Sequence, residues 1–122
     1  MNKLPYHQLV YVAGPYRAYE GHPVEENIQK AREAAIRLWQ AGNAVICPHA
    51  NSAGMDGIIP DDEFIRRDLL IVARCDSIYL LKDFRKSRGA LEEQAVAVKF
   101  GLEIYYEEEE TLEPSGTNRT DE

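Results

Sequence analysis

The sequence has few of the residues on which metal and disulfide chemistry depend. Its two cysteines, Cys47 and Cys75, form no Cys-x-x-Cys pair and are too few for a disulfide framework. Its three histidines stand apart, without the short spacings that zinc sites use. We therefore expect two free, buried thiols, no metal and no cofactor.

Long apolar runs and a broad positive charge are also missing. No segment approaches the length of a membrane span, and residues 1–5 do not resemble a secretory leader. The net charge is -7, but seven acids and only one base lie from residue 107 onward, which leaves 14 acids and 13 bases in residues 1–106. A nearly neutral body has no footprint for duplex nucleic acid. We expect a cytoplasmic protein that binds neither a membrane nor duplex nucleic acid. Residues 107–122 are expected to form an acidic, disordered tail.

Apolar runs that end at turn residues alternate with segments of helical periodicity. We expect strands over 8–13, 44–47, 77–81 and 102–106, and helices over 24–41, 61–74 and 89–100. Asp61 or Asp62 is expected to cap the second helix. The alternation predicts one α/β domain over residues 1–106, a three-layer αβα sandwich with a flavodoxin- or Rossmann-like parallel sheet of four to five strands. Ligands bind such sheets beyond the carboxyl ends of the strands, which here means segments 14–20, 48–60 and 82–93.

Glu93 interrupts the apolar stripe of the third expected helix. Its neighbours at helical spacing are all small or apolar: Gly89, Ala90, Val96 and Ala97. An ionised carboxylate is costly to bury unless it is paired or its pKa rises, and such groups gather at functional sites. Glu93 therefore caps nearby backbone, pairs with an arginine or belongs to an active site. Glu92, four residues after Arg88, has the spacing of an ordinary surface ion pair.

Asp68 is exceptional in the same way on the second helix. Its neighbours at helical spacing are all apolar: Phe64, Ile65, Ile71 and Val72. A partner among Arg66, Arg67 or Arg74 would explain this position without any function. Two such acids near the expected ligand edge favour a carboxylate pair.

The segment between the third strand and the third helix suits an anion. Ser87 is placed to cap the helix, whose free N–H groups and partial positive charge attract anions. Gly89 lets a ligand approach the backbone closely, and Lys86 and Arg88 add positive charge. Neither the P-loop spacing nor the Gly-x-Gly-x-x-Gly fingerprint of dinucleotide sites is present.

Two other segments offer ligand contacts. After the first strand, Gly14 provides a turn, Tyr16 an aromatic ring and Arg17 a guanidinium suited to bidentate phosphate contact. In the loop after the second strand, His49 beside Asn51 either contacts a sugar hydroxyl or caps local backbone. These groups favour a nucleoside or nucleotide as the ligand.

Several of these residues occur together in a known family. The chain resembles the nucleoside 2-deoxyribosyltransferase superfamily, which includes the 2'-deoxynucleoside 5'-phosphate N-hydrolases, and is closest to a branch frequent in bacteria and phages. The matching positions are Tyr11-Val12-Ala13-Gly14-Pro15-Tyr16, Asn27, Arg67-Asp68-Leu69 and Ser87-x-Gly89-x-x-x-Glu93-x-x-x-Ala97. The resemblance covers residues 9 to 106. It implies a flavodoxin-like fold, a homodimer or homotetramer, and cleavage or transfer at the N-glycosidic bond.

The resemblance also assigns roles. Glu93 would be the nucleophile that attacks C1' of the sugar, Asp68 would orient that carboxylate or help the base to leave, and Tyr16 would contact the sugar or base in the catalytic centre. Ser87, Gly89 and Arg17 match positions that hold the 5'-phosphate in the hydrolase branch. From the residues themselves we add Gly14, His49, Asn51 and Arg88 as expected substrate or phosphate contacts. In relatives a neighbouring subunit supplies residues from its C-terminal region, for which the acidic tail here has no obvious equivalent.

We therefore expect an N-glycosidase or deoxyribosyltransferase-like enzyme. Hydrolysis of a 5'-phosphorylated substrate is preferred because Arg17, Lys86 and Arg88 supply more positive charge than a plain nucleoside requires. The alternatives are a nucleotide-binding or sensing module that performs no chemistry and a structural protein that binds no nucleotide. The sequence leaves open which base is bound, whether the sugar carries a 2'-hydroxyl, and whether water or a second base is the acceptor.

Overall fold

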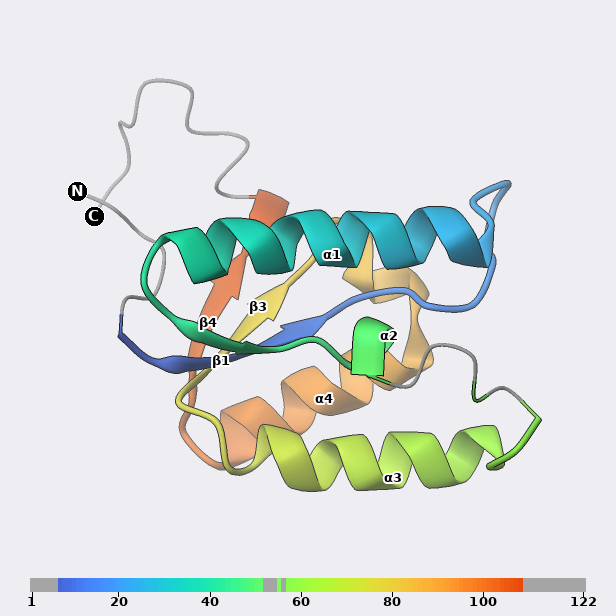
Figure 1. The fold of residues 1–122 in the computed structure, drawn as a ribbon. Coiled ribbons are helices and arrows are strands. Elements are labelled where there is room, and N and C mark those ends of the chain that lie inside the picture. The colour runs from blue at the N-terminus through green and yellow to red at the C-terminus, as the bar shows by residue number, and fades with distance from the viewer. Residues whose placement is uncertain (1–6, 52–54, 56, 109–122) are drawn as a thin grey trace.

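The chain forms a four-stranded parallel sheet (Figure 1). The computed structural model describes residues 7–51, 55 and 57–108. The strands are β1 (Leu9–Ala13), β2 (Ala44–Ile46), β3 (Ser77–Leu80) and β4 (Glu103–Tyr106). Their order is β2-β1-β3-β4, and every neighbouring pair is parallel, so that Tyr11 lies opposite Ile46 on one side and Ile78 on the other.

Helices cover both faces of this sheet. They are α1 (Val24–Gln40), α2 (Pro48–Asn51), α3 (Asp61–Val72), the 3-10 turn η1 (Phe84–Lys86) and α4 (Arg88–Lys99). Figure 1 shows α1 on one face and α3 with α4 on the other. Side chains alternate along a strand, so Val10 and Val12 pack against α1 while Tyr11 and Ala13 pack towards α3 and α4. The expected three-layer αβα sandwich with a parallel sheet is confirmed.

The expected strands and helices are all present, with bounds that differ by one or two residues. Two local differences concern the segment before α3. The short helix α2 occupies part of the expected loop. The expectation that Asp61 or Asp62 caps α3 is wrong, because Pro60 holds the N-cap position without a side-chain bond. Both aspartates fall instead in the first helical turn, where their charge complements the helix dipole.

The structure also bears on the expected cysteines, membrane spans and acidic tail. Cys47 and Cys75 are free and buried, as expected. None of the helices in the described ranges has the length and apolar character that a membrane span requires. Of the expected tail, Glu107 and Glu108 form ion pairs with Arg37 and Arg85, and residues 109–122 lie outside the described residues.

The topology points to one place for a ligand. β1 lies between β2 and β3, because the chain passes from β1 to β2 on one side and returns to β3 on the other. The strand order therefore reverses at β1. In open α/β sheets, ligands bind beyond the carboxyl ends of the strands at such a reversal.

Candidate functional site

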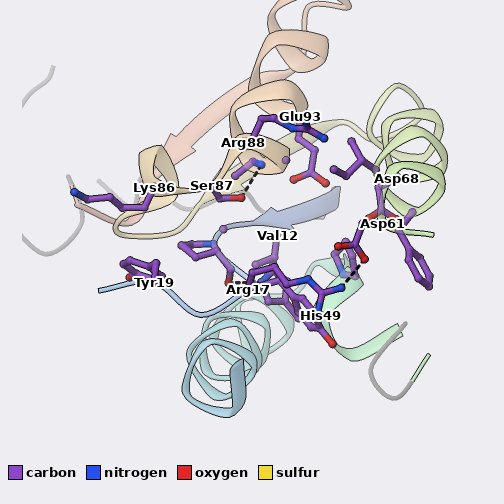
Figure 2. Close-up of a pocket in the computed structure, with 18 of the residues that line it drawn as sticks. Val12, Arg17, Tyr19, His49, Asp61, Asp68, Lys86, Ser87, Arg88 and Glu93 are labelled. Atoms are coloured by element: carbon purple, nitrogen blue, oxygen red, sulfur yellow. Dashed lines mark hydrogen bonds and ion pairs between the residues drawn. The ribbon is translucent and has the colours of Figure 1, made fainter. Parts of the chain in front are cut away.

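A cavity of about 280 Å³ lies where the chain leaves β1 and β3 (Figure 2). Its walls come from the segment after β1, the start of α2, the inner side of α3 and the first turns of α4. Segments 14–20, 48–60 and 82–93, which were expected to meet at a site, all contribute to it. Its polar side chains are Tyr16, Arg17, Tyr19, His49, Asp61, Asp68, Lys86, Ser87, Arg88 and Glu93.

Glu93 lies on the inward side of α4 and is only 8% exposed. The hydroxyl of Tyr11, at the centre of β1, donates a 2.6 Å hydrogen bond to Oε2 of Glu93. Burial raises the pKa of Glu93 to about 8, the nearby charge of Asp68 acts in the same direction, and the Tyr11 hydrogen bond acts against them. Neither an arginine nor a backbone N–H of the described residues accounts for its burial.

Asp68 lies on α3 and is half-buried at the same cavity. Burial raises the pKa of Asp68 to about 6. The arginines that sequence reasoning offered as partners are engaged elsewhere, since Arg66 and Arg67 pair with Glu63 at 2.9 and 3.5 Å. Within the described residues no ion pair includes Asp68. The structure thus brings into one cavity two carboxyl groups that have no cationic partner among the described residues.

Tyr16 and His49 form a second wall of the cavity. Their rings meet edge to face, with centroids 5.6 Å apart. His49 is buried, and its Nε2 donates a 2.8 Å hydrogen bond to the carbonyl of Pro15, so it does cap local backbone. Its Nδ1 has no hydrogen-bond partner among the described residues. Burial lowers the pKa of His49, so the ring is neutral and this buried Nδ1 is a hydrogen-bond acceptor.

Asn27 of α1 holds the loop that carries Tyr16 in place. This buried amide donates hydrogen bonds of 3.1 and 3.0 Å to the carbonyls of Tyr16 and Arg17. The role of Asn51 as a contact cannot be followed, because its side chain lies outside the described residues.

The first turn of α4 has the geometry expected of an anion cradle. The hydroxyl oxygen of Ser87 accepts a 3.1 Å hydrogen bond from the N–H of Ala90, which confirms Ser87 as the helix cap. A Cβ added at Gly89 would lie 3.7 Å from Ile65, an ordinary contact, so an alanine would fit there without displacing its neighbours. Gly14 differs, because a Cβ there would lie 2.6 Å from Cδ1 of Leu81. Packing against Leu81 therefore requires a glycine at position 14.

The three cations at the cavity are each bound to an acid. Arg17 pairs with Asp61 at 2.5 Å, and Lys86 pairs with Glu20 at 2.8 Å. Arg88 pairs with Asp62 at 3.2 Å and with Glu92 at 3.7 Å, the latter at the surface as its spacing indicated. A ligand phosphate that uses these cations has to compete with carboxylates of the protein itself.

Sequence reasoning missed Tyr11 as a site residue. A strand alternates its side chains between faces, which places Tyr11 on the same side as the helix that carries Glu93. That alternation was the available signal, but it does not show that two residues 82 positions apart share a hydrogen bond. Asp61, Glu20 and Asp62, which pair with the cavity cations, were missed because they are distant from them in the sequence.

Among the described residues, no three His, Cys, Asp or Glu side chains gather as a metal site would need. No curated protein matches the sequence. Residues 8–106 match the model of one family, described as Domain of unknown function (DUF4406). The matched segment contains the whole sheet and every residue of the cavity, so the chain belongs to the DUF4406 family.

Proposed function

We propose that the protein cleaves the N-glycosidic bond of a nucleoside 5'-monophosphate, or transfers its sugar between bases, with Glu93 as the nucleophile. The observation that carries this proposal is the buried Glu93, held by Tyr11 and facing a cavity that also receives Asp68. Structural acids are usually neutralised by a cation, whereas this pair has none among the described residues. The resemblance to deoxyribosyltransferases, whose motifs include both acids, supports the same assignment.

The proposed reaction follows the logic of retaining glycosidases. A carboxylate oxygen of Glu93 attacks C1', the bond from C1' to the base nitrogen breaks, and its electron pair leaves with the base, which takes up a proton. Water then attacks C1', the bond to Glu93 breaks with its electron pair returning to the carboxylate, and the proton lost by the water passes to solvent, which leaves the free sugar phosphate. In the transfer reaction a second base takes the place of water. Asp68 orients Glu93 or assists the departing base.

The opposite end of the cavity would hold the phosphate. The N–H groups at the start of α4 and the hydroxyl hydrogen of Ser87 are donors for its oxygens, and a glycine at position 89 lets the phosphate approach the helix backbone. Arg17, Lys86 and Arg88 also line the cavity and add positive charge to it. Hydrolysis of a phosphorylated substrate is therefore preferred over cleavage of a plain nucleoside.

A nucleotide-binding or sensing module without chemistry is the second candidate. The observation in its favour is the pKa of Glu93, about 8, which leaves this carboxyl mostly protonated at neutral pH. A protonated carboxyl is a poor nucleophile. Such a module would bind nucleotides in the same cavity and release no base.

Incubation with a panel of deoxynucleotides and ribonucleotides, followed by chromatography of the free base, separates the two candidates. We expect base release by the wild-type protein and none by Glu93→Ala. The matched control is Glu92→Ala, which removes an adjacent acid whose side chain is 44% exposed. Circular dichroism checks that both variants fold. Saturable binding without base release, even with an acceptor base present, would favour the sensor, and turnover by Glu93→Ala would exclude Glu93 as the nucleophile.

The resemblance further predicts a homodimer or homotetramer, and the sequence composition predicts a cytoplasmic protein. Sedimentation of the full chain tests the oligomeric state. A monomer with full activity would show that no second subunit is needed to complete the cavity.

A further inference from the structure

The segment between β1 and α1 folds back into a tight hairpin at Tyr19 to His22. Tyr19 and His22 exchange backbone hydrogen bonds of 3.1 and 2.7 Å. The two residues at the tip are left-handed, with φ of 43° at Glu20 and 82° at Gly21. Asparagine or glycine normally occupies the first of these positions, and a glutamate there is strained. Backbone strain of this kind persists where the surrounding structure holds it in place.

Two contacts fasten this hairpin to the segment before α4. Nζ of Lys86 lies 2.8 Å from Oε2 of Glu20, and the Tyr19 hydroxyl donates a 3.0 Å hydrogen bond to Asp83. Asp83 is also left-handed, with φ of 69°. The contact therefore joins two strained turns, each of which presents an acid to the other segment. We call the pair of contacts, Lys86–Glu20 and Tyr19–Asp83, the latch.

The latch engages a cation of the phosphate end of the cavity. Lys86 lines that cavity and precedes Ser87, the cap of α4. Figure 2 shows its side chain extended away from Glu93, in the direction opposite to the catalytic end. Glu20 raises the pKa of Lys86, which keeps the amine charged. A phosphate at the start of α4 and the carboxylate of Glu20 are therefore rivals for one ammonium group.

We propose that Glu20 is a built-in competitor for the ligand phosphate and sets the charge specificity of the cavity. Phosphate displaces the Glu20 carboxylate from Lys86, and the hairpin is released as the ligand binds. A neutral sugar has no group that replaces the carboxylate, so it leaves the latch closed. This inference rests on the proposed phosphate position but not on any cleavage of the ligand.

Removal of the competing charge should strengthen phosphate binding. Lys86 and Glu20 have side chains that are 47% and 62% exposed, and exposed pairs of this kind contribute little. We therefore expect Glu20→Gln to bind 2-deoxyribose 5-phosphate about two- to fivefold more tightly than the wild type. Binding of unphosphorylated 2-deoxyribose should not change. These probes contain no base, so the result does not depend on which base the cavity accepts.

A double-mutant cycle with Lys86→Met tests whether the two residues act on each other. The full chain is titrated with each probe and followed by NMR chemical shifts, as wild type, Glu20→Gln, Lys86→Met and the double variant. Glu20→Gln should improve affinity only when Lys86 is present. The control is Glu33→Gln, which removes the same charge from α1, where Glu33 accepts a hydrogen bond from Gln29 outside the cavity.

Three outcomes would overturn the latch. The first is that Glu20→Gln raises the affinity for 2-deoxyribose 5-phosphate as much in the Lys86→Met background as in the wild type. The second is that Glu33→Gln raises this affinity as much as Glu20→Gln does. The third is that no form of the protein binds the sugar phosphate. The base-release assay decides the proposed function separately. Release of base with no effect of Glu20→Gln would reject the latch alone, whereas the expected affinity pattern without base release would reject the enzyme alone.

Discussion

Burial gives the two carboxylates of the cavity different acidities. The pKa of Glu93 is raised to about 8, and that of the less buried Asp68 to about 6. Between these pH values Asp68 is ionised while Glu93 retains its proton. Environments that separate the pKa values of two neighbouring acids are typical of sites that use them in different roles. Glu93 must lose its proton before it can attack a sugar, so its acidity should limit the rate.

The pH dependence of kcat/KM therefore reports on Glu93 and Tyr11. For the wild type we expect kcat/KM to rise about tenfold per pH unit and to level off above about pH 8. Tyr11→Phe removes the hydrogen bond that lowers the pKa of Glu93, so its profile should move to higher pH. Its plateau should fall about ten- to hundredfold, because hydrogen bonds to charged groups contribute about 1.5–3 kcal/mol.

Tyr105→Phe is the matched control for this substitution. Its hydroxyl donates to Glu103, which lies outside the cavity, so the profile should stay that of the wild type. A rate that falls as the pH rises towards 8 would mean that Glu93 acts in its protonated form, as an acid.

β1 and the turn after it connect the core to the cavity. Tyr11 extends from the middle of the strand to Glu93, and Gly14 follows the strand directly. Sequence reasoning assigned Gly14 and Gly89 to ligand contact alike. The structure separates them, because a Cβ at Gly14 would lie 2.6–2.9 Å from the side chain of Leu81, which is 4% exposed, whereas one at Gly89 meets nothing closer than 3.7 Å.

Alanine at these two positions should have opposite effects. Gly14→Ala should lower the free energy of unfolding by about 1–3 kcal/mol, the usual result of overpacking a core. Gly89→Ala should leave it unchanged or raise it by up to about 1 kcal/mol, since alanine favours a helix interior over glycine. Urea unfolding measures both.

Gly14→Ala and Gly89→Ala also distinguish a packing role from a role in ligand binding. Gly89→Ala should still weaken the binding of 2-deoxyribose 5-phosphate, because its methyl group would lie 3.8 Å from Oγ of Ser87, where the phosphate is proposed to bind. Equal destabilisation by the two substitutions, or unchanged binding by Gly89→Ala, would contradict this division.

At the scale of the whole molecule, periodicity was enough to predict the architecture. The strand and helix patterns fixed the layers, and Asp68 and Glu93 were found because each breaks an apolar helix face. What the patterns do not contain are contacts between distant segments. The pairs Arg17–Asp61 and Lys86–Glu20 join residues 44 and 66 positions apart, and no local rule relates them. The pairing of Arg17 and Lys86 therefore emerged only from the folded chain, unlike the pair Arg88–Glu92, whose spacing had indicated it.

Glu93 also affects the stability of the whole domain. Its pKa, about 8 in the folded chain, exceeds the value of 4.5 for an ordinary glutamate, so the folded state keeps a proton that the unfolded state releases. The contribution of this protonated group to the free energy of unfolding is therefore complete below about pH 4.5 and is lost as the pH rises to about 8.

Glu93→Gln should remove this loss, because a glutamine cannot ionise yet still accepts the hydrogen bond from Tyr11. We expect the variant to exceed the wild type in free energy of unfolding by about 2–4 kcal/mol near pH 9 and to differ little near pH 4. Urea unfolding at the two pH values provides the comparison, with Glu92→Gln as the exposed control. An equal change in the free energy of unfolding for Glu93→Gln and Glu92→Gln would mean that Glu93 is not desolvated. The expected gain, together with complete loss of base release, would identify Glu93 as a position where function is maintained at the expense of stability.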